Sequence, residues 1–458
     1  MSGPAARKTT LYIVTAVVLI AIIAGVAYYF YAAAPAPAAP PAEEVGTIVI
    51  GVPTSTDFLY GWTAAKGVRL AAEEINEAGG VIIGGKRYNF EVVVMNTRDL
   101  EPGVPTSEAL MVVEKVITER GADVLIGGPA RSEAALACLA LDAQYKKIHI
   151  HSTGTLTPRL NKEIANNYDK YKYTFRISHE AAGLAREAFE ILSYLRDKYG
   201  FNKVYIMVQD VAHARAIGNI LKSKLEEAGG WEVYGPDIYP TGATDYSTSL
   251  VRARDVGAQI LFIWMDHPET SILIKQWHDL KIPALPVTGI CSAMEMPTAW
   301  NETGGYIEYV IACPCNTGNA WSNYAPAMEF FNKHKERWGI EPEGYGAVSS
   351  YTAVYVFKDA LERAAAKDPE AVRKYIEENT AAPDVLIKAL EETDYMGPYG
   401  RIRFDPQSHQ VIQSYDPDEG AVTCWFQWLN GKRVQIWPPN PEVALSEIQI
   451  PPWMAAGS

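Results

Sequence analysis

Two histidines lie two residues apart, at His149 and His151, inside an apolar stretch. On a β-strand, residues i and i+2 project from the same face, so the two imidazoles could begin a metal site that Asp266 or His267 completes. A metal-dependent hydrolase is therefore one interpretation. The sequence contains no HExxH, no GxSxG and no phosphate-binding glycine loop. We therefore expect no enzyme activity, no metal site and no cofactor.

A second candidate functional motif is the sequence PARS at 129–132, which directly precedes a predicted helix. Free amides and the helix dipole make such a position an anion site. The Ser132 hydroxyl suits a ligand carboxylate and also suits an N-cap. Arg131, beside Ala130, could pair with a ligand, pair with Glu133 or lie in solvent.

Short apolar strands alternate with amphipathic helices over most of the chain. The first series has strands at 47–52, 90–95, 123–126 and 147–150, and helices at 63–78, 107–120 and 133–145. The pattern restarts with a helix at 180–199 and strands at 203–208, 232–239 and 259–265. The tetrapeptide EAGG at 77–80 recurs at 227–230. This order predicts an α/β fold of two Rossmann-like lobes, each a parallel-type sheet flanked by helices.

Ligands of open α/β sheets bind on the loops beyond the carboxyl ends of the strands. Two facing lobes would therefore form a ligand cleft between those loops. The loops concerned are 53–62, 127–132, 151–157, 209–213, 266–269 and 289–292.

Residues 11–31 form an uncharged run of 21 residues. As a helix with a rise of about 1.5 Å per residue, this run spans roughly 31 Å, the thickness of a bilayer core. Arg7 and Lys8 precede it, so the positive-inside rule makes residues 1–10 a cytoplasmic tail and puts the folded part outside a membrane that the chain crosses once. Residues 32–45 are rich in alanine and proline and predict an extended stalk. The alternative is a cleaved signal peptide and a secreted protein.

The overall charge and the cysteines set two further limits. The formal net charge of -13 over 458 residues makes nucleic acid a poor partner. Five cysteines leave at least one unpaired within the chain, and we expect them to be buried and partly bridged. They are Cys138, Cys291, Cys313, Cys315 and Cys424.

Several short motifs, taken in order, resemble one known family. They are GVRLAAEEIN at 67–76 running to Gly79-Gly80, IGG at 126–128, STGT at 152–155, TDYS at 244–247, and GPYG at 397–400 leading to RFD at 403–405. Together they resemble the branched-chain amino-acid-type solute-binding proteins of ATP-binding cassette (ABC) transporters, the Leu/Ile/Val-binding family with the type I periplasmic binding fold. The likeness covers roughly residues 46 to 437.

The resemblance implies how the chain divides and what it does. Lobe one would hold residues 46–176 and 313–402, and lobe two residues 177–312 and 403–450, with three crossovers as a hinge and 451–458 as a tail. The lobes would close around a small carboxylate-bearing metabolite, with an amino acid the leading case, and deliver it to a permease with its ATPase subunits. An extracellular ligand-sensing receptor is the alternative.

The resemblance also implies the roles of individual residues. Tyr60 would lie against the ligand side chain, and Ser132 would help to hold the ligand carboxylate. Thr153, Gly154 and Thr155 would contact the same carboxylate through backbone and hydroxyl groups.

In the second lobe, the resemblance points to three more positions. His213 occupies a loop that brings an aromatic group over the ligand. Cys291 falls near the position of the acidic residue that binds the ammonium group in amino-acid binders, and Asp266 could replace that acid from the neighbouring strand end.

Overall fold

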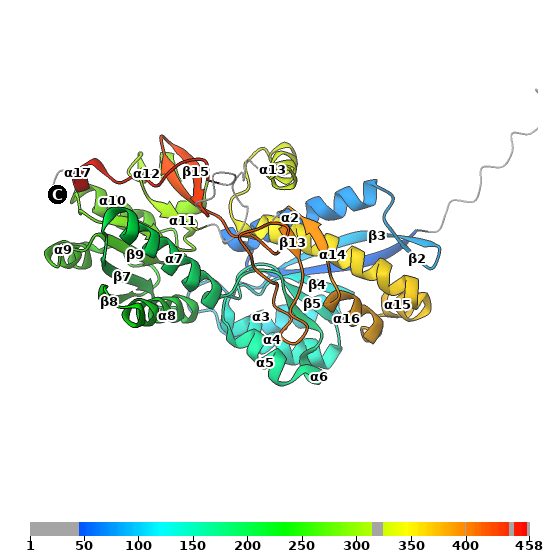
Figure 1. The fold of residues 1–458 in the computed structure, drawn as a ribbon. Helices are drawn as coiled ribbons and strands as arrows, with labels where there is room; N and C mark the ends of the chain where they lie inside the picture. Colours follow the sequence, from blue (N-terminus) through cyan, green and yellow to red (C-terminus); the bar gives the residue numbers. More distant parts are fainter. Residues whose placement is uncertain (1–44, 314–323, 399, 439–443, 456–458) are drawn as a thin grey trace, which may run out of the picture. The chain divides into compact units, whose positions relative to one another are not determined.

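Two β-sheets covered by helices make up a mixed α/β fold in the computed structural model (Figure 1). The structure describes residues 45–313, 324–398, 400–438 and 444–455. The first sheet has the order β2-β3-β1-β4-β5-β6, and its strands are parallel except for β2. Its strands are β1 (Gly46–Thr54), β2 (Val81–Ile83), β3 (Lys86–Asn96), β4 (Val124–Gly127), β5 (Ile148–His151) and β6 (Thr174–Arg176).

Helices lie on both faces of the first sheet because its strands are apolar on both sides. Ile48, Ile50 and Val52 of β1 belong to a core shared with α2 and α14, whereas Gly51 faces α3. A Cβ at Gly51 would lie 2.2 Å from Val116 Cγ1, so glycine allows α3 to approach this closely. The helices packed with this sheet are α2 (Leu59–Glu77), α3 (Thr106–Thr118), α4 (Ser132–Tyr145), α5 (Arg159–Asn166), α6 (Tyr168–Tyr171), α13 (Ala325–Trp338), α14 (Tyr345–Lys367), α15 (Pro369–Glu377) and α16 (Asp384–Glu391).

The second sheet has the order β15-β14-β11-β10-β9-β7-β8, and its last two strands in the chain, β14 and β15, run antiparallel. Its strands are β7 (Lys203–Gln209), β8 (Glu232–Tyr239), β9 (Ile260–Trp264), β10 (Leu285–Thr288), β11 (Ile311–Ala312), β14 (Trp425–Leu429) and β15 (Lys432–Trp437). The helices in this part of the chain are α7 (Ala181–Tyr199), α8 (Ala212–Ala228), α9 (Ser247–Asp255), α10 (Thr270–Asp279), α11 (Ser292–Glu295), α12 (Ala299–Thr303) and α17 (Pro452–Ala455). The alternating sides of β7 and β9 face two cores, one shared with α7 and α8 and the other with α9 and α10.

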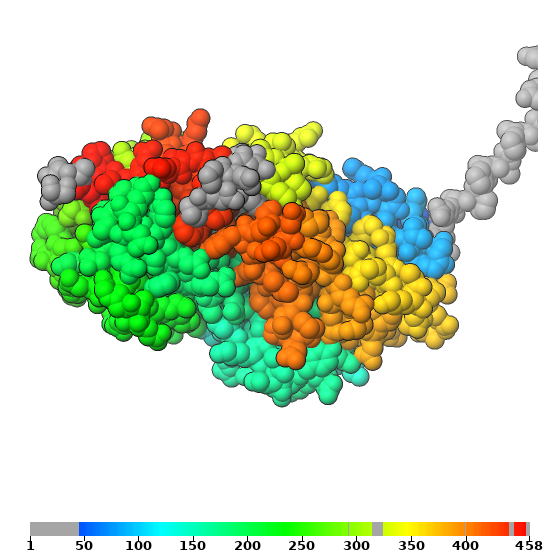
Figure 2. Space-filling view, viewed as in Figure 1, coloured from blue at the N-terminus to red at the C-terminus, as the bar shows by residue number. Residues whose placement is uncertain are grey.

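The chain passes between the sheets from β6 to α7, from β11 toward α13, and after the short hairpin of β12 (Tyr395–Gly397) and β13 (Gly400–Ile402). Two of these connections lie side by side. The Arg176 amide donates to the His409 carbonyl at 3.0 Å, and the Val411 amide donates to the Arg176 carbonyl at 2.9 Å. Figure 2 shows the stretch after β13, in orange, at the surface next to the blue-green region of α5 and α6.

One helix begins earlier than the sequence predicts. The helix expected from residue 63 begins at Leu59, because the extended Phe58 precedes it and accepts the amide of Trp62 at 3.1 Å. Gly61 lies on this first turn, and a Cβ there would lie 1.8 Å from the Ser55 carbonyl oxygen. Tyr60 is therefore on the first turn of α2 rather than in a loop.

Three predictions concern residues that lie wholly or partly outside the described ranges. The predicted membrane span at 11–31 and the stalk at 32–45 lie outside them, apart from Val45. Within the described ranges, no helix is long and apolar enough to cross a bilayer. Cys138, Cys291 and Cys424 are buried and have free thiols, so none of them forms one of the expected disulfide bonds. Cys315 lies outside the described residues.

Candidate ligand-binding site

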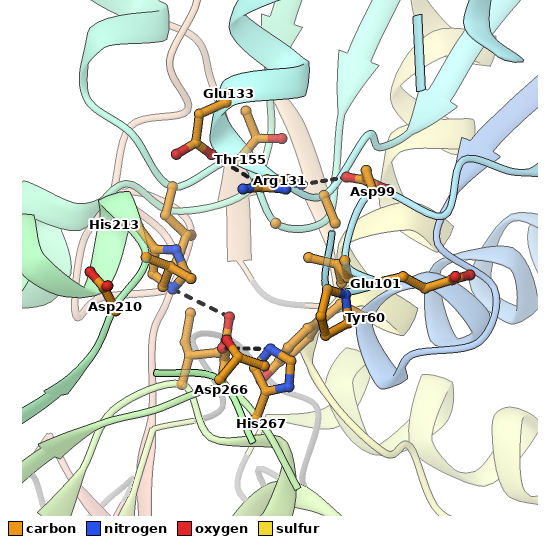
Figure 3. A pocket seen from close by; sticks show the side chains of 18 of the residues that line it. Tyr60, Asp99, Glu101, Arg131, Glu133, Thr155, Asp210, His213, Asp266 and His267 are labelled. Atoms are coloured by element: carbon orange, nitrogen blue, oxygen red, sulfur yellow. Dashed lines mark hydrogen bonds and ion pairs between the residues drawn. The ribbon is translucent and has the colours of Figure 1, made fainter. Parts of the chain in front are cut away.

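A cavity of about 260 Å³ is lined by loops from the carboxyl ends of strands in both sheets (Figure 3). The first sheet contributes the loops after β1, β3, β4 and β5, and the second contributes those after β7, β8, β9 and β10. The lining residues are Tyr60, Asp99, Leu100, Glu101, Pro102, Gly103, Ala130, Arg131, Glu133, Gly154, Thr155, Leu156, Asp210, Val211, His213, Thr241, Asp266, His267, Ile290 and Tyr345. The rule that ligands bind beyond the carboxyl ends of parallel strands predicts this place.

Most of the predicted site residues come together along this cavity. Those that line it are Tyr60, Ala130, Arg131, Gly154, Thr155, His213 and Asp266. Ser132, Thr153 and Cys291 are not among the lining residues. The Thr153 hydroxyl donates to the Tyr60 carbonyl at 2.8 Å, and Cys291 is fully buried in a core of the second sheet.

The protein itself occupies part of the anion site expected at the start of α4. The Asp99 carboxylate accepts the Arg131 amide at 2.6 Å and also the Ala130 amide. The N-cap residue is Arg131, so the prediction of a Ser132 N-cap is wrong. Burial raises the pKa of Asp99, and the hydrogen bonds from Thr97 and these amides oppose that shift. These two amides are therefore not available to a ligand carboxylate, whereas the buried Ser132 hydroxyl has no hydrogen-bond partner among the described residues.

The loop at 153–155 also uses its donors internally. Gly154 has φ +59°, and its amide donates to the Tyr345 hydroxyl at 2.8 Å. The Thr155 amide donates to the Ala130 carbonyl at 2.7 Å, and the Thr155 hydroxyl donates to the Pro129 carbonyl at 2.7 Å. In the structure these three donors are already bonded within the protein, and their contact with a ligand carboxylate stays a prediction. Their bonds fix the shape of the cavity wall.

Arg176, at the end of β6, holds the same loop from behind. Its guanidinium is fully buried and donates to the Thr155 carbonyl at 2.6 Å and to the Thr157 carbonyl at 2.8 Å, while Glu180 lies 3.3 Å away. Burial lowers the pKa of Arg176 to about 10. Sequence reasoning missed this positioning residue. The available signal was an arginine between Phe175 and Ile177, in a stretch where the sequence analysis predicted no strand.

On the second sheet, Asp266 lies between two imidazoles (Figure 3). Its carboxylate is 3.4 Å from His213 Nε2 and 3.8 Å from His267 Nε2. The Asp266 amide donates to Gln209 Oε1 at 3.0 Å, which fixes the start of the loop. Burial lowers the pKa of His213, although Asp266 opposes the shift, so this imidazole is neutral near pH 7.

The cavity has a surplus of negative charge. Its carboxylates are those of Asp99, Glu101, Glu133, Asp210 and Asp266, whereas its one arginine or lysine is Arg131. The guanidinium of Arg131 lies 3.4 Å from Glu133, Asp210 pairs with Arg215, and Glu101 pairs with Arg98 at 2.7 Å, so arginines offset three of the five carboxylates. A net negative lining attracts a ligand that bears a positive group.

Two tyrosines form an aromatic wall. The rings of Tyr60 and Tyr345 have centroids 5.5 Å apart, and the Tyr60 hydroxyl is 3.5 Å from Glu295 Oε1. Burial, followed by Glu295, raises the pKa of Tyr60 well above its usual value. A second cavity of about 250 Å³ adjoins this wall and is mostly apolar; Phe58, Trp62 and other residues line it together with Tyr60.

Sequence reasoning missed four lining residues that carry functional groups: Asp99, Glu101, Asp210 and Tyr345. Asp99 and Glu101 follow β3, and the carboxyl-end rule would have found them had that loop been considered. Tyr345 begins α14, far along the chain, and no local pattern connects it to the cavity.

The histidine pair of β5 belongs to a different place. His149 and His151 gather with Asp142, and all three are buried. The prediction that Asp266 or His267 completes this group is wrong, since both line the cavity and neither histidine of β5 does. The geometry therefore gives no support to a hydrolase site formed by these residues.

This chain belongs to the periplasmic binding protein family, whose model matches residues 48–416. The resemblance stated from the sequence is thereby confirmed. A relative, Leu/Ile/Val-binding protein homolog 8 of Brucella melitensis, is 20% identical over 394 residues, which cover 84% of this chain and 88% of the relative.

Solved structures share the fold. An ABC transporter substrate-binding protein from Sphaerobacter thermophilus has a TM-score of 0.67 and 19% identity, covering 85% of this chain and 96% of that one. The substrate-binding protein LivJ from Streptococcus pneumoniae, in complex with isoleucine, has a TM-score of 0.65 and 19% identity, covering 85% and 98%. A solute-binding protein from Rhodopseudomonas palustris, in complex with 3,4-dihydroxybenzoic acid, has a TM-score of 0.65 and 18% identity, covering 88% and 99%.

Proposed function

We propose that this chain captures a small amino acid or a close relative outside the cytoplasm and delivers it to an ABC permease and its ATPase subunits. The observation that carries the proposal is the cavity, because residues beyond the carboxyl ends of strands in both sheets line it. A ligand that touches both sheets favours the arrangement in which they lie close together, and a permease can recognise that arrangement. The proposed lobes are residues 46–176 with 313–402, and residues 177–312 with 403–450.

The charge of the cavity favours an amino acid over a plain carboxylate. The solved relatives named above include one with isoleucine and one with 3,4-dihydroxybenzoic acid. A plain anion would meet a surplus of carboxylates, whereas an ammonium group can pair with Asp266. The Arg131 guanidinium is the proposed partner of the ligand carboxylate, in place of the amides that Asp99 occupies. Tyr60 would contact the ligand body.

A thermal-shift screen of amino acids and small aromatic acids on the full chain is the first test, since a ligand that binds the folded state stabilises it. Calorimetry then compares the best amino acid with two truncated analogues of the same side chain: the acid without its amino group and the amine without its carboxyl group. Each charge-assisted hydrogen bond contributes roughly 1.5–3 kcal/mol, so each truncation should weaken binding by about tenfold or more.

The outcomes of this screen separate the parts of the proposal. Stabilisation by aromatic acids but by no amino acid would overturn the ligand class and keep the binding function. Metal-dependent turnover of an amide or ester by the purified chain would contradict the expectation that it is not an enzyme.

We also propose that residues 11–31 anchor the chain in the membrane with the folded part outside. The support is the uncharged run and the two basic residues before it. Membrane fractionation should find the native protein in the membrane pellet, and protease added outside intact cells should digest the folded part. An N-terminal sequence of the native protein that starts near residue 35 would contradict this proposal.

A further inference from the structure

A buried polar cluster lies between β5 and α4, outside the cavity. It consists of Asp142, His149 and His151, whose ligand-type atoms all lie within 4.8 Å of one another. The two imidazole rings stack with centroids 4.0 Å apart, as expected for residues i and i+2 on one strand face. All three residues have no exposed surface.

The hydrogen bonds of His149 set its tautomer. Its Nε2 lies 2.8 Å from the Gly128 carbonyl oxygen, which can only accept, so Nε2 carries the proton. The lone pair of Nδ1 then faces Asp142 Oδ1 at 2.9 Å. Two lone pairs at this distance repel each other unless a cation, either a proton or a metal ion, lies between them.

These hydrogen bonds are of the kind that orient the ligand side chains in known metal sites. A metal-bound imidazole usually donates its other N–H to a backbone carbonyl, and a metal-bound carboxylate is itself hydrogen-bonded. His149 donates to Gly128 in this way, and the second oxygen of Asp142 accepts the Thr174 hydroxyl at 2.7 Å. Both groups are therefore already oriented as ligands.

His151 provides an independent observation. Neither of its ring nitrogens has a hydrogen-bond partner among the described residues, although the side chain is fully buried. A buried polar group without a partner destabilises a fold, and native proteins rarely leave one so. A bound cation would satisfy His151.

We infer that Asp142, His149 and His151 form a buried binding site for a divalent first-row transition-metal ion, with Zn²⁺ the best fit. Imidazole nitrogen and carboxylate oxygen are the ligands that Zn²⁺ accepts, at about 2.0–2.2 Å. The 2.9 Å between His149 Nδ1 and Asp142 Oδ1 is compatible with two such bonds to one ion.

The charge of the cluster points to a fourth ligand. Zn²⁺ with one carboxylate and two neutral imidazoles leaves one positive charge in the core, and Arg176 lies opposite His151 in the sheet. With three protein ligands, water or hydroxide would take the fourth position of the ion, and hydroxide would cancel the excess charge. The ion would then join β5 to α4, the two elements whose ends support the cavity wall.

The test measures zinc in the full chain, expressed with zinc in the medium and purified in detergent. The purified protein is washed with a chelator, denatured in guanidinium, and its released zinc is measured. We expect about one zinc ion per chain, and a fivefold or larger loss in His151→Gln. The matched control is His334→Gln, because His334 is equally buried but lies on α13; it should keep its zinc.

A second measurement covers the case in which His151→Gln does not fold. Wild-type chain refolded with cobalt(II) in place of zinc should show the visible absorption of a tetrahedral site. Equal zinc in wild type and His151→Gln, or no zinc and no cobalt spectrum in wild type, would overturn the inference. A proton would then bridge His149 and Asp142.

Discussion

The loop that carries Gly154 gives the sharpest test of the cavity wall. Gly154 has φ +59°, and a Cβ there would lie 2.2 Å from the Ala130 carbonyl oxygen and 2.5 Å from the Ala130 Cα. Both neighbours are backbone atoms and cannot rotate away. Gly154→Ala must therefore separate this loop from the start of α4, where other lining residues lie.

Two contributions to the expected cost can be separated. A left-handed backbone costs an alanine about 1–2 kcal/mol, and forcing a methyl group into a packed site adds about 1–3 kcal/mol. Gly200 provides the matched control, because it has φ +73° and nothing within 4 Å of its added Cβ. Gly200→Ala should cost only the backbone part, about 1–2 kcal/mol, and Gly154→Ala about 2–5 kcal/mol.

Urea unfolding of both variants measures the free energies, and calorimetry measures ligand affinity. We expect Gly154→Ala to lose more stability than Gly200→Ala and also to lose ligand affinity, while Gly200→Ala keeps its affinity. Equal stability losses, or a Gly154→Ala variant that binds like wild type, would refute the role assigned to this close contact.

Three further predictions concern the supports of the site and the pH dependence of folding. Asp99→Ala removes the acceptor of the Arg131 amide and should lower the free energy of unfolding by about 1.5–3 kcal/mol in urea; an unchanged value would mean that water replaces the carboxylate. Glu187 is buried, which raises its pKa from 4.5 to about 7, so the folded state holds this proton more tightly than the unfolded chain does. The stability that Glu187 contributes should thus be fully present below about pH 4.5 and be lost as the pH rises through about 7, and Glu187→Gln should remove this part of the pH dependence. Arg176→Met should weaken ligand binding without touching the ligand, because Thr155 and Thr157 lose their shared donor, and wild-type affinity in a folded variant would contradict this.

Local pattern was enough to predict much of the fold. Apolar strands and amphipathic helices have different periods, so the alternation from β1 to β9 is visible in the sequence. The rule for the carboxyl ends of parallel strands then placed Tyr60, Arg131 and Asp266 at one cavity. The antiparallel strands β14 and β15 were not predicted, since they follow a long irregular segment.

Hydrogen bonds between residues that are far apart in the sequence could not be predicted. The start of α4 has the pattern of an open anion site, but Asp99, 32 residues earlier, occupies part of it. The hydroxyls of Thr153 and Thr155 look available in the sequence and instead donate to the backbone of neighbouring loops. Hydrogen-bond donors near a cavity are shared among many loops, and only the folded structure shows which of them a ligand can reach.

One measurement tests most directly whether a zwitterion bridges the two sheets. The best ligand from the thermal screen is titrated by calorimetry into Arg131→Met, on the first sheet, and into Asp266→Asn, on the second. Asp255→Asn is the control, because Asp255 is an acidic residue at the end of α9 that does not line the cavity. Losing one charged partner exceeds about 1.4 kcal/mol, so each of the two variants should bind about tenfold more weakly or worse, while the control binds like wild type. Unchanged affinity in both Arg131→Met and Asp266→Asn would contradict the account.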